Sequence, residues 1–139
     1  MSTFLRPVSH TLKQVRAFSV SASRSNLNKV QLIGRVGSDP IVNETSESRR
    51  VANYTVATSE VRADKEGSLV KSTQWHRITY WQPAEWFSKI KKGDQVYVEG
   101  KLRYSDYTDK EGVTRTKAEI HQTSVKLLSL SRNNQQEEE

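Results

Sequence analysis

The chain has 139 residues, of which 34% are hydrophobic and 27% are charged, so it has room for one modest domain with short appendages. It contains no cysteine, which excludes disulfides, thiolate nucleophiles and cysteine-based zinc sites. Its 22 lysine and arginine residues against 16 aspartate and glutamate residues give a net charge of +6, which favours polyanionic partners.

The N-terminal segment, residues 1–25, is basic, rich in serine and free of acidic residues. Leu5, Val8, Leu12 and Val15 recur at the three- and four-residue spacing that lines one face of a helix. This combination is typical of a mitochondrial transit peptide, which is disordered or cleaved. The alternative interpretation is a disordered basic arm that adds electrostatic affinity for a polyanion.

Residues 26–130 alternate apolar and polar side chains over short stretches that turn signals interrupt, which predicts β-strands in a single domain. The expected strands are Val30–Val36, Val51–Thr58, Trp75–Trp81, Gln95–Leu102 and Lys117–Leu130.

Three segments between the strands and one after them have distinct compositions. Ser59–Ser72 is polar and charged, and we expect a long connecting loop there. Pro83–Lys92 predicts a short helix, because proline suits the first helical position and large apolar side chains follow at helical spacing. Asp109–Gly112 is expected at the tip of a hairpin. Residues 131–139 contain no apolar side chain and end in three glutamates, so we expect a disordered acidic tail.

The order of three strands, one helix and two strands indicates an all-β fold. It is the pattern of the OB-fold, a five-stranded Greek-key barrel with one short helix between strands three and four. Such barrels bind oligonucleotides on one face and through their loops.

The third predicted strand carries the most informative alternation. Trp75, Arg77, Thr79 and Trp81 share one face of it, and His76 lies on the other. Two tryptophans around an arginine suit the stacking of nucleobases, which tolerates any sequence because every base has a π-face. The alternative is that both tryptophans belong to the core while the arginine reaches out to solvent.

The predicted loop carries basic residues, and the predicted hairpin carries basic residues beside Tyr104 and Tyr107, which together supply charge for a phosphate backbone and rings for its bases. The phosphate contacts expected are Arg35, Arg62, Lys65, Lys71, Arg77, Lys101, Arg103 and Arg115.

Five motifs, in this order, resemble the mitochondrial single-stranded DNA-binding proteins of the bacterial-type family. They are Leu27–Pro40, Ala57–Glu60, Thr73–Arg77, Lys92–Gly100 and Tyr107–Asp109. The resemblance implies a homotetramer of OB-folds in the mitochondrial matrix and its nucleoid. Such a protein protects and organises single-stranded DNA during mitochondrial DNA replication, beside the polymerase and helicase. It implies no catalytic activity, no cofactor and no membrane partner.

The resemblance also assigns roles to particular residues. The base-stacking positions of the family fall on Trp75, Trp81 and Tyr107, while a fourth position, usually tryptophan, is Val61 here. His76 matches a histidine that the family uses at its subunit interface. The acidic tail lacks the apolar closing pair with which bacterial members recruit partner enzymes, so that mode of recruitment is not expected.

Other functions remain open to different degrees. A mitochondrial OB-fold RNA-binding protein fits the same stacking chemistry, because telling RNA from DNA requires contacts to the 2′-hydroxyl. A scaffold that binds only protein could use the same aromatic face. The three histidines lie far apart, and the acidic residues fall mainly in turns and loops. We therefore expect neither a metal site nor an enzyme.

Overall fold

The computed structural model describes residues 2–5 and 25–135. The transit-peptide prediction for residues 1–25 falls almost entirely outside this part of the chain, as do the last four residues of the predicted acidic tail. None of the helices in the described ranges has the length and apolar character needed to cross a membrane.

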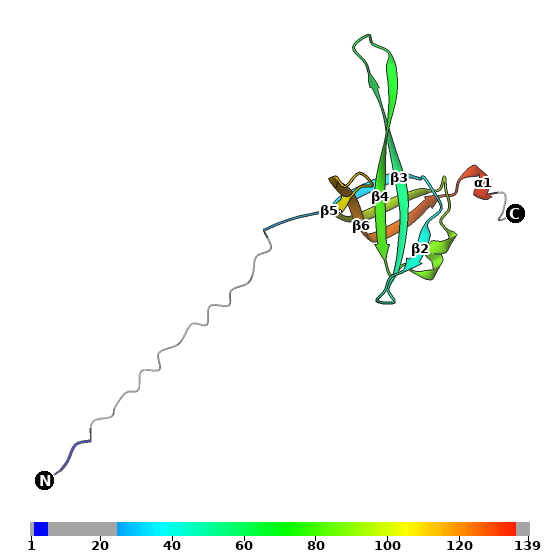
Figure 1. The fold of residues 1–139 in the computed structure, drawn as a ribbon. Helices are drawn as coiled ribbons and strands as arrows, with labels where there is room; N and C mark the ends of the chain where they lie inside the picture. The colour runs from blue at the N-terminus through cyan, green and yellow to red at the C-terminus, as the bar shows by residue number, and fades with distance from the viewer. Residues whose placement is uncertain (1, 6–24, 136–139) are drawn as a thin grey trace.

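Within the described residues the fold consists of six strands and two short helical turns (Figure 1). The strands are β1 (Val30–Val36), β2 (Ile41–Glu44), β3 (Arg50–Ala63), β4 (Leu69–Trp81), β5 (Gln95–Thr108) and β6 (Thr114–Ser129), and the helical turns are a 3₁₀ helix (Glu85–Lys89) and α1 (Arg132–Gln135).

The strands pair in the order β1-β5-β6-β4-β3-β2, and a second pairing of β1 with β3 closes five of them into a barrel. The β4–β6 pair is parallel and the other pairs are antiparallel. The 3₁₀ helix lies between β4 and β5, the third and fourth barrel strands. The predicted OB-fold barrel, with a helix at this point of the chain, is confirmed.

The barrel interior is filled by alternate residues of its strands and closed by the 3₁₀ helix. The buried hydrophobic residues that form this core are Val36, Ala52, Tyr54, Val56, Ile78, Phe87, Ile90, Val96, Val98 and Ile120. The ring of Phe87 packs against the rings of Tyr54 and Tyr80, with centroids 5.3 and 5.0 Å away. Every second residue of the barrel strands therefore faces outward and is free to form a surface.

The prediction of a long loop over Ser59–Ser72 is wrong. These residues extend β3 and β4 into a hairpin that projects from the barrel (Figure 1), and the turn lies at its tip, where the amide of Gly67 donates to Asp64 O. Both faces of the projecting part are exposed, so its side chains need no alternation of apolar and polar residues. The hydrogen bonds between β3 and β4 stabilise the hairpin, and they leave no alternation in the sequence from which the strands could be predicted.

Three other elements differ from the sequence prediction. The short strand β2 was not expected, because its four residues are all exposed and carry no burial pattern. The predicted helix over Pro83–Lys92 is confined to the 3₁₀ turn Glu85–Lys89. Residues 131–135 were expected to be disordered, but Arg132–Gln135 form α1 and the segment is held to the barrel by Asp94, which is fully buried and accepts hydrogen bonds from Ser131 N at 2.9 Å and Asn134 Nδ2 at 2.7 Å.

Candidate nucleic-acid interface

The outer face of β4 carries the two predicted tryptophans. Ile78 of this strand points into the core, so its neighbours of opposite parity, Trp75, Arg77, Thr79 and Trp81, point outward. Trp75 is 62% exposed, and the interpretation of this residue as core is therefore wrong. Thr79 is the exception on this face, because it is buried and donates to Asn53 Oδ1 at 3.4 Å.

Trp75 lies against β1 and borders a groove. Its register partner on β3 is Ala57. The indole ring extends past β3 and packs over Gly37, which follows β1, and the absence of a side chain on Gly37 leaves space for the ring. A cavity of about 440 Å³ beside the ring is lined by Arg35 and Lys71 among others, and we call it the aromatic groove. The structure thus brings together three residues that the sequence analysis assigned to stacking and phosphate contacts.

Arg35 and Lys71 reach the aromatic groove from different strands. The Arg35 guanidinium is oriented by one hydrogen bond, from Nη1 to the carbonyl oxygen of Gly93 at 2.9 Å, which leaves its other donors available. Lys71 lies opposite Val61 in the β3–β4 ladder, on the same face as Trp75. The groove therefore combines one exposed indole with two cationic groups.

Trp81 lies at the other end of the same face, in a more crowded setting. It is 37% exposed, its ring centroid lies 6.5 Å from that of His121, and the guanidinium carbon of Arg49 lies 4.9 Å above its ring. Neither neighbour was singled out from the sequence, because both contacts depend on strand register. Part of the Trp81 ring remains open to solvent.

The outer face continues from β4 onto the β5–β6 hairpin. Thr79 lies beside His121 in the parallel β4–β6 pair, which places the outward residues of the two strands on one surface. The outward register pairs of the hairpin are Lys101–His121, Arg103–Glu119, Ser105–Lys117 and Tyr107–Arg115. Tyr107 is 43% exposed, and the predicted cationic residues Lys101 and Arg103 share its face. The surface therefore runs from Trp75 across three strands to Tyr107.

Carboxylates restrain two of the cations on this hairpin. Arg115 Nε donates to Asp109 Oδ2 at 2.6 Å, and this hydrogen bond lowers the pKa of Asp109 below its usual value. Lys117, which the sequence analysis did not select, forms an ion pair with Glu119 at 2.8 Å. Arg115 is thus a weaker candidate for a phosphate contact than Lys101 or Arg103.

The remaining predicted residues occupy different places. Arg62 is exposed on the face of the β3–β4 hairpin opposite Trp75 and lies 3.8 Å from Glu60, so it is not brought to the aromatic groove. Lys65 is in the turn at the hairpin tip. Val61 is 62% exposed on the Trp75 face, where a larger side chain would meet solvent.

His76 lies on the face of β4 opposite Trp75, as the alternation predicts. It is half-buried, and its Nε2 atom is 2.8 Å from the Thr58 hydroxyl oxygen. The described residues thus supply one partner for this ring, and its role at a subunit interface stays a prediction.

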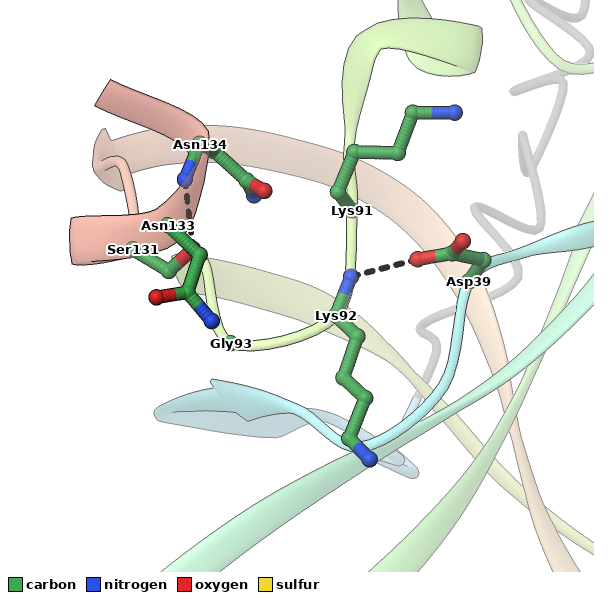
Figure 2. A pocket seen from close by; sticks show the side chains of 7 residues that line it. All are labelled: Asp39, Lys91, Lys92, Gly93, Ser131, Asn133 and Asn134. Atoms are coloured by element: carbon green, nitrogen blue, oxygen red, sulfur yellow. Dashed lines mark hydrogen bonds between the residues drawn. The ribbon is translucent and has the colours of Figure 1, made fainter. Parts of the chain in front are cut away.

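A larger cavity, of about 600 Å³, lies between the loop that carries Lys91 and Lys92 and the segment that carries Ser131 and Asn134 (Figure 2). Its lining among the described residues includes no aromatic side chain, and the ammonium groups of its two lysines point away from each other. The backbone amide of Lys92 donates to Asp39 Oδ1 at 2.7 Å, so a carboxylate also lines this space. These features do not suit a stacked base, and the aromatic groove remains the candidate site.

The chain is similar to known proteins over most of its length. Residues 27–128 match the Single-strand binding protein family. The mitochondrial single-stranded DNA-binding protein of Bos taurus is 36% identical over 140 residues, which cover 91% of this chain and 95% of that protein. A single-stranded DNA-binding protein of Neisseria meningitidis is 43% identical over 105 residues, covering 74% of this chain and 60% of that protein.

A solved structure of similar fold has a nucleic acid bound. It is described as the Plasmodium falciparum SSB complex with ssDNA, and it matches with a TM-score of 0.65 and 31% sequence identity over 76% of this chain and 96% of that one. The sequence resemblance, the closed five-stranded barrel and these matches agree, and the chain belongs to the single-strand binding protein family.

Proposed function

We propose that this chain binds single-stranded DNA without sequence preference. Bases stack on Trp75, Trp81 and Tyr107, and cationic side chains along the same outer surface contact the phosphates. The cations proposed for this role are Arg35, Lys71, Arg77, Lys101 and Arg103, with a lesser contribution from Arg115. Lesser contributions are also proposed for two residues outside that surface, Lys65 at the tip of the β3–β4 hairpin and Arg62 on its opposite face. The observation that carries the proposal is the exposed Trp75 indole in a groove lined by Arg35 and Lys71.

The chemistry of this surface favours unpaired strands. An indole or phenol ring stacks a base with about 1–3 kcal/mol, and the base must expose its face to make that contact. Paired bases in a duplex hide their faces within the stack, so a duplex keeps only the phosphate contacts. The cations along the surface bind the backbone of any sequence, which accounts for binding without base readout.

The relatives support a mitochondrial role. Three of the mitochondrial relatives, including those of Bos taurus and Pongo abelii, share about a third of their residues with this chain and cover 91% of it. We propose that residues 1–25 direct the protein to the mitochondrial matrix and that residues 26–130 form the DNA-binding domain. There it would protect and organise displaced DNA in the nucleoid during replication, beside the polymerase and helicase, with no catalytic activity or cofactor of its own.

The proposal includes a homotetramer. His76 is half-buried on the face of β4 that Ile78 turns to the core, so a subunit contact through the exposed part of His76 would leave the stacking residues uncovered. A barrel of about 100 residues has a small core, and self-association buries additional apolar surface.

Titration with oligo-dT and oligo-rU of equal length, read by quenching of tryptophan fluorescence, tests the function. The proposal predicts quenching and tight binding by oligo-dT. Tighter binding by oligo-rU would favour an RNA-binding protein, and binding of neither oligomer would leave the aromatic surface as a site for protein. A duplex competitor in the same titration measures the phosphate contribution alone.

A further inference from the structure

The turn between β2 and β3 places an arginine on one of the proposed stacking residues. The guanidinium carbon of Arg49 lies 4.9 Å from the centroid of the Trp81 ring, within the range of a cation–π interaction. Arg49 is exposed, and nothing in the sequence pattern of its neighbours distinguishes it from Arg50 beside it.

Strand register explains why Arg49 rather than Arg50 reaches the indole. Val51 is the direct partner of Trp81 in the β3–β4 ladder, and Arg49 precedes Val51 by two residues, so it continues the same face. Arg50 belongs to the opposite face and lies across from Glu44 of β2.

The backbone of Arg49 is held in place by Thr45. The amide of Thr45 donates to the carbonyl oxygen of Arg49 at 2.8 Å, and the amide of Arg49 donates to the Thr45 hydroxyl at 3.3 Å. The turn closes through Ser48, whose φ of 57° lies in the left-handed region. The position of the guanidinium is therefore set by a closed turn at one end and by the indole at the other.

The charge of Arg49 has no acidic partner in the described part of the chain, where none of the ion pairs involves it. A guanidinium carries five donors in its plane, and stacking on a ring engages its face and leaves those donors free. Arg49 thus offers an oriented cation at the edge of a ring on which a base is proposed to stack.

We propose that Arg49 binds a backbone phosphate of the single strand, so that the interface extends past Trp81 over the β2–β3 turn. This inference rests on the proposed DNA-binding function. It adds Arg49 to the phosphate-binding cations proposed above, none of which lies in the β2–β3 turn. The phosphate belongs to the nucleotide whose base stacks on the open part of the Trp81 ring. Arg49 then acts with Arg77 and Lys101 along one outer surface.

The salt dependence of oligo-dT binding tests the proposal, with Arg49→Gln, Arg49→Lys and the matched control Arg50→Gln. Each neutralised phosphate on a single strand contributes about 0.7 to the slope of log K against log salt concentration. Arg49→Gln should reduce the magnitude of the slope by about 0.7 and weaken binding at low salt. Arg49→Lys should keep the slope, because its ammonium still meets the phosphate, and Arg50→Gln should match the wild type.

Three results would overturn the proposal: an unchanged slope in Arg49→Gln, an equal loss of slope in both glutamine variants, or tighter binding by Arg49→Gln. The last would mean that Arg49 covers the Trp81 ring and competes with the base.

A wild-type protein that fails to bind oligo-dT would overturn the proposed function itself. Wild-type binding with an unchanged Arg49→Gln slope would overturn the Arg49 proposal alone. Thermal unfolding of each variant confirms that the exposed substitutions leave the fold intact.

Discussion

Gly37 controls the position of the Trp75 ring, and Gly37→Ala should therefore weaken DNA binding without adding or removing any charge. A β-carbon on Gly37 would lie 2.5 Å from Cζ3 of Trp75 and 2.5 Å from the Thr55 hydroxyl oxygen. Carbon atoms in favourable contact are about 3.5–4.0 Å apart, so the indole must retreat by about 1 Å or more. Gly37 does not have a left-handed φ, so alanine fits its backbone conformation.

The expected magnitudes separate binding from stability. Trp75 is 62% exposed and can swing toward solvent, so the loss of stability should fall at the lower end of the about 1–3 kcal/mol typical of overpacking. A base that no longer stacks on the ring costs about 1–3 kcal/mol of binding free energy. This corresponds to a roughly 5- to 150-fold weaker affinity.

A double-mutant cycle identifies the cause. Fluorescence anisotropy of a labelled oligo-dT measures affinity for the wild type, Gly37→Ala, Trp75→Ala and the double variant. If the glycine acts through the ring, Gly37→Ala should have little further effect once Trp75 is alanine. An equal loss in both backgrounds, or no loss in the wild-type background, would refute the role of Gly37 in seating the ring.

Three further substitutions probe the surface and the assembly. Val61→Trp should tighten oligo-dT binding by up to about 1–3 kcal/mol, measured by the same anisotropy titration, and unchanged affinity would mean that the strand does not pass this part of the hairpin. Tyr107→Ala should weaken binding by a similar amount and leave the oligomer intact in sedimentation analysis, whereas full affinity would remove this hairpin from the interface. His76→Ala should shift the oligomer toward smaller species in sedimentation while tryptophan quenching by oligo-dT persists, and an unaltered oligomer would contradict the interface role.

The sequence predicts the barrel well because a strand with one buried face must alternate apolar and polar side chains with a period of two residues. The alternation placed Trp75 and Trp81 on one face of the strand but left open whether that face is the core or the surface, and the inward position of Ile78 in the structure decides for the surface. The extension of β3 and β4 beyond the barrel could not be predicted, because a hairpin exposed on both faces imposes no such period. The turn of this hairpin, by contrast, can be recognised in the sequence, because Gly67 has a φ of 82° and glycine is the residue that most readily adopts such a conformation.

Contacts between distant parts of the chain were beyond prediction for a different reason. The cation–π contact of Arg49 with Trp81 depends on a register that pairs Val51 with Trp81, and a shift of one residue would send Arg50 there instead. The docking of residues 131–135 depends on the buried carboxylate of Asp94, which is distant in sequence. Composition alone indicated a solvated tail.

The central claim is that the outer aromatic surface binds unpaired bases. It is tested most directly by measuring the affinity of the wild-type protein for oligo-dT and for a duplex of the same length in the same buffer, with tryptophan fluorescence as the second readout. The account predicts far tighter binding of the single strand, together with quenching that the duplex does not produce, because only unpaired bases expose their faces to Trp75 and Trp81. Equal affinity and equal quenching for the two forms would contradict it.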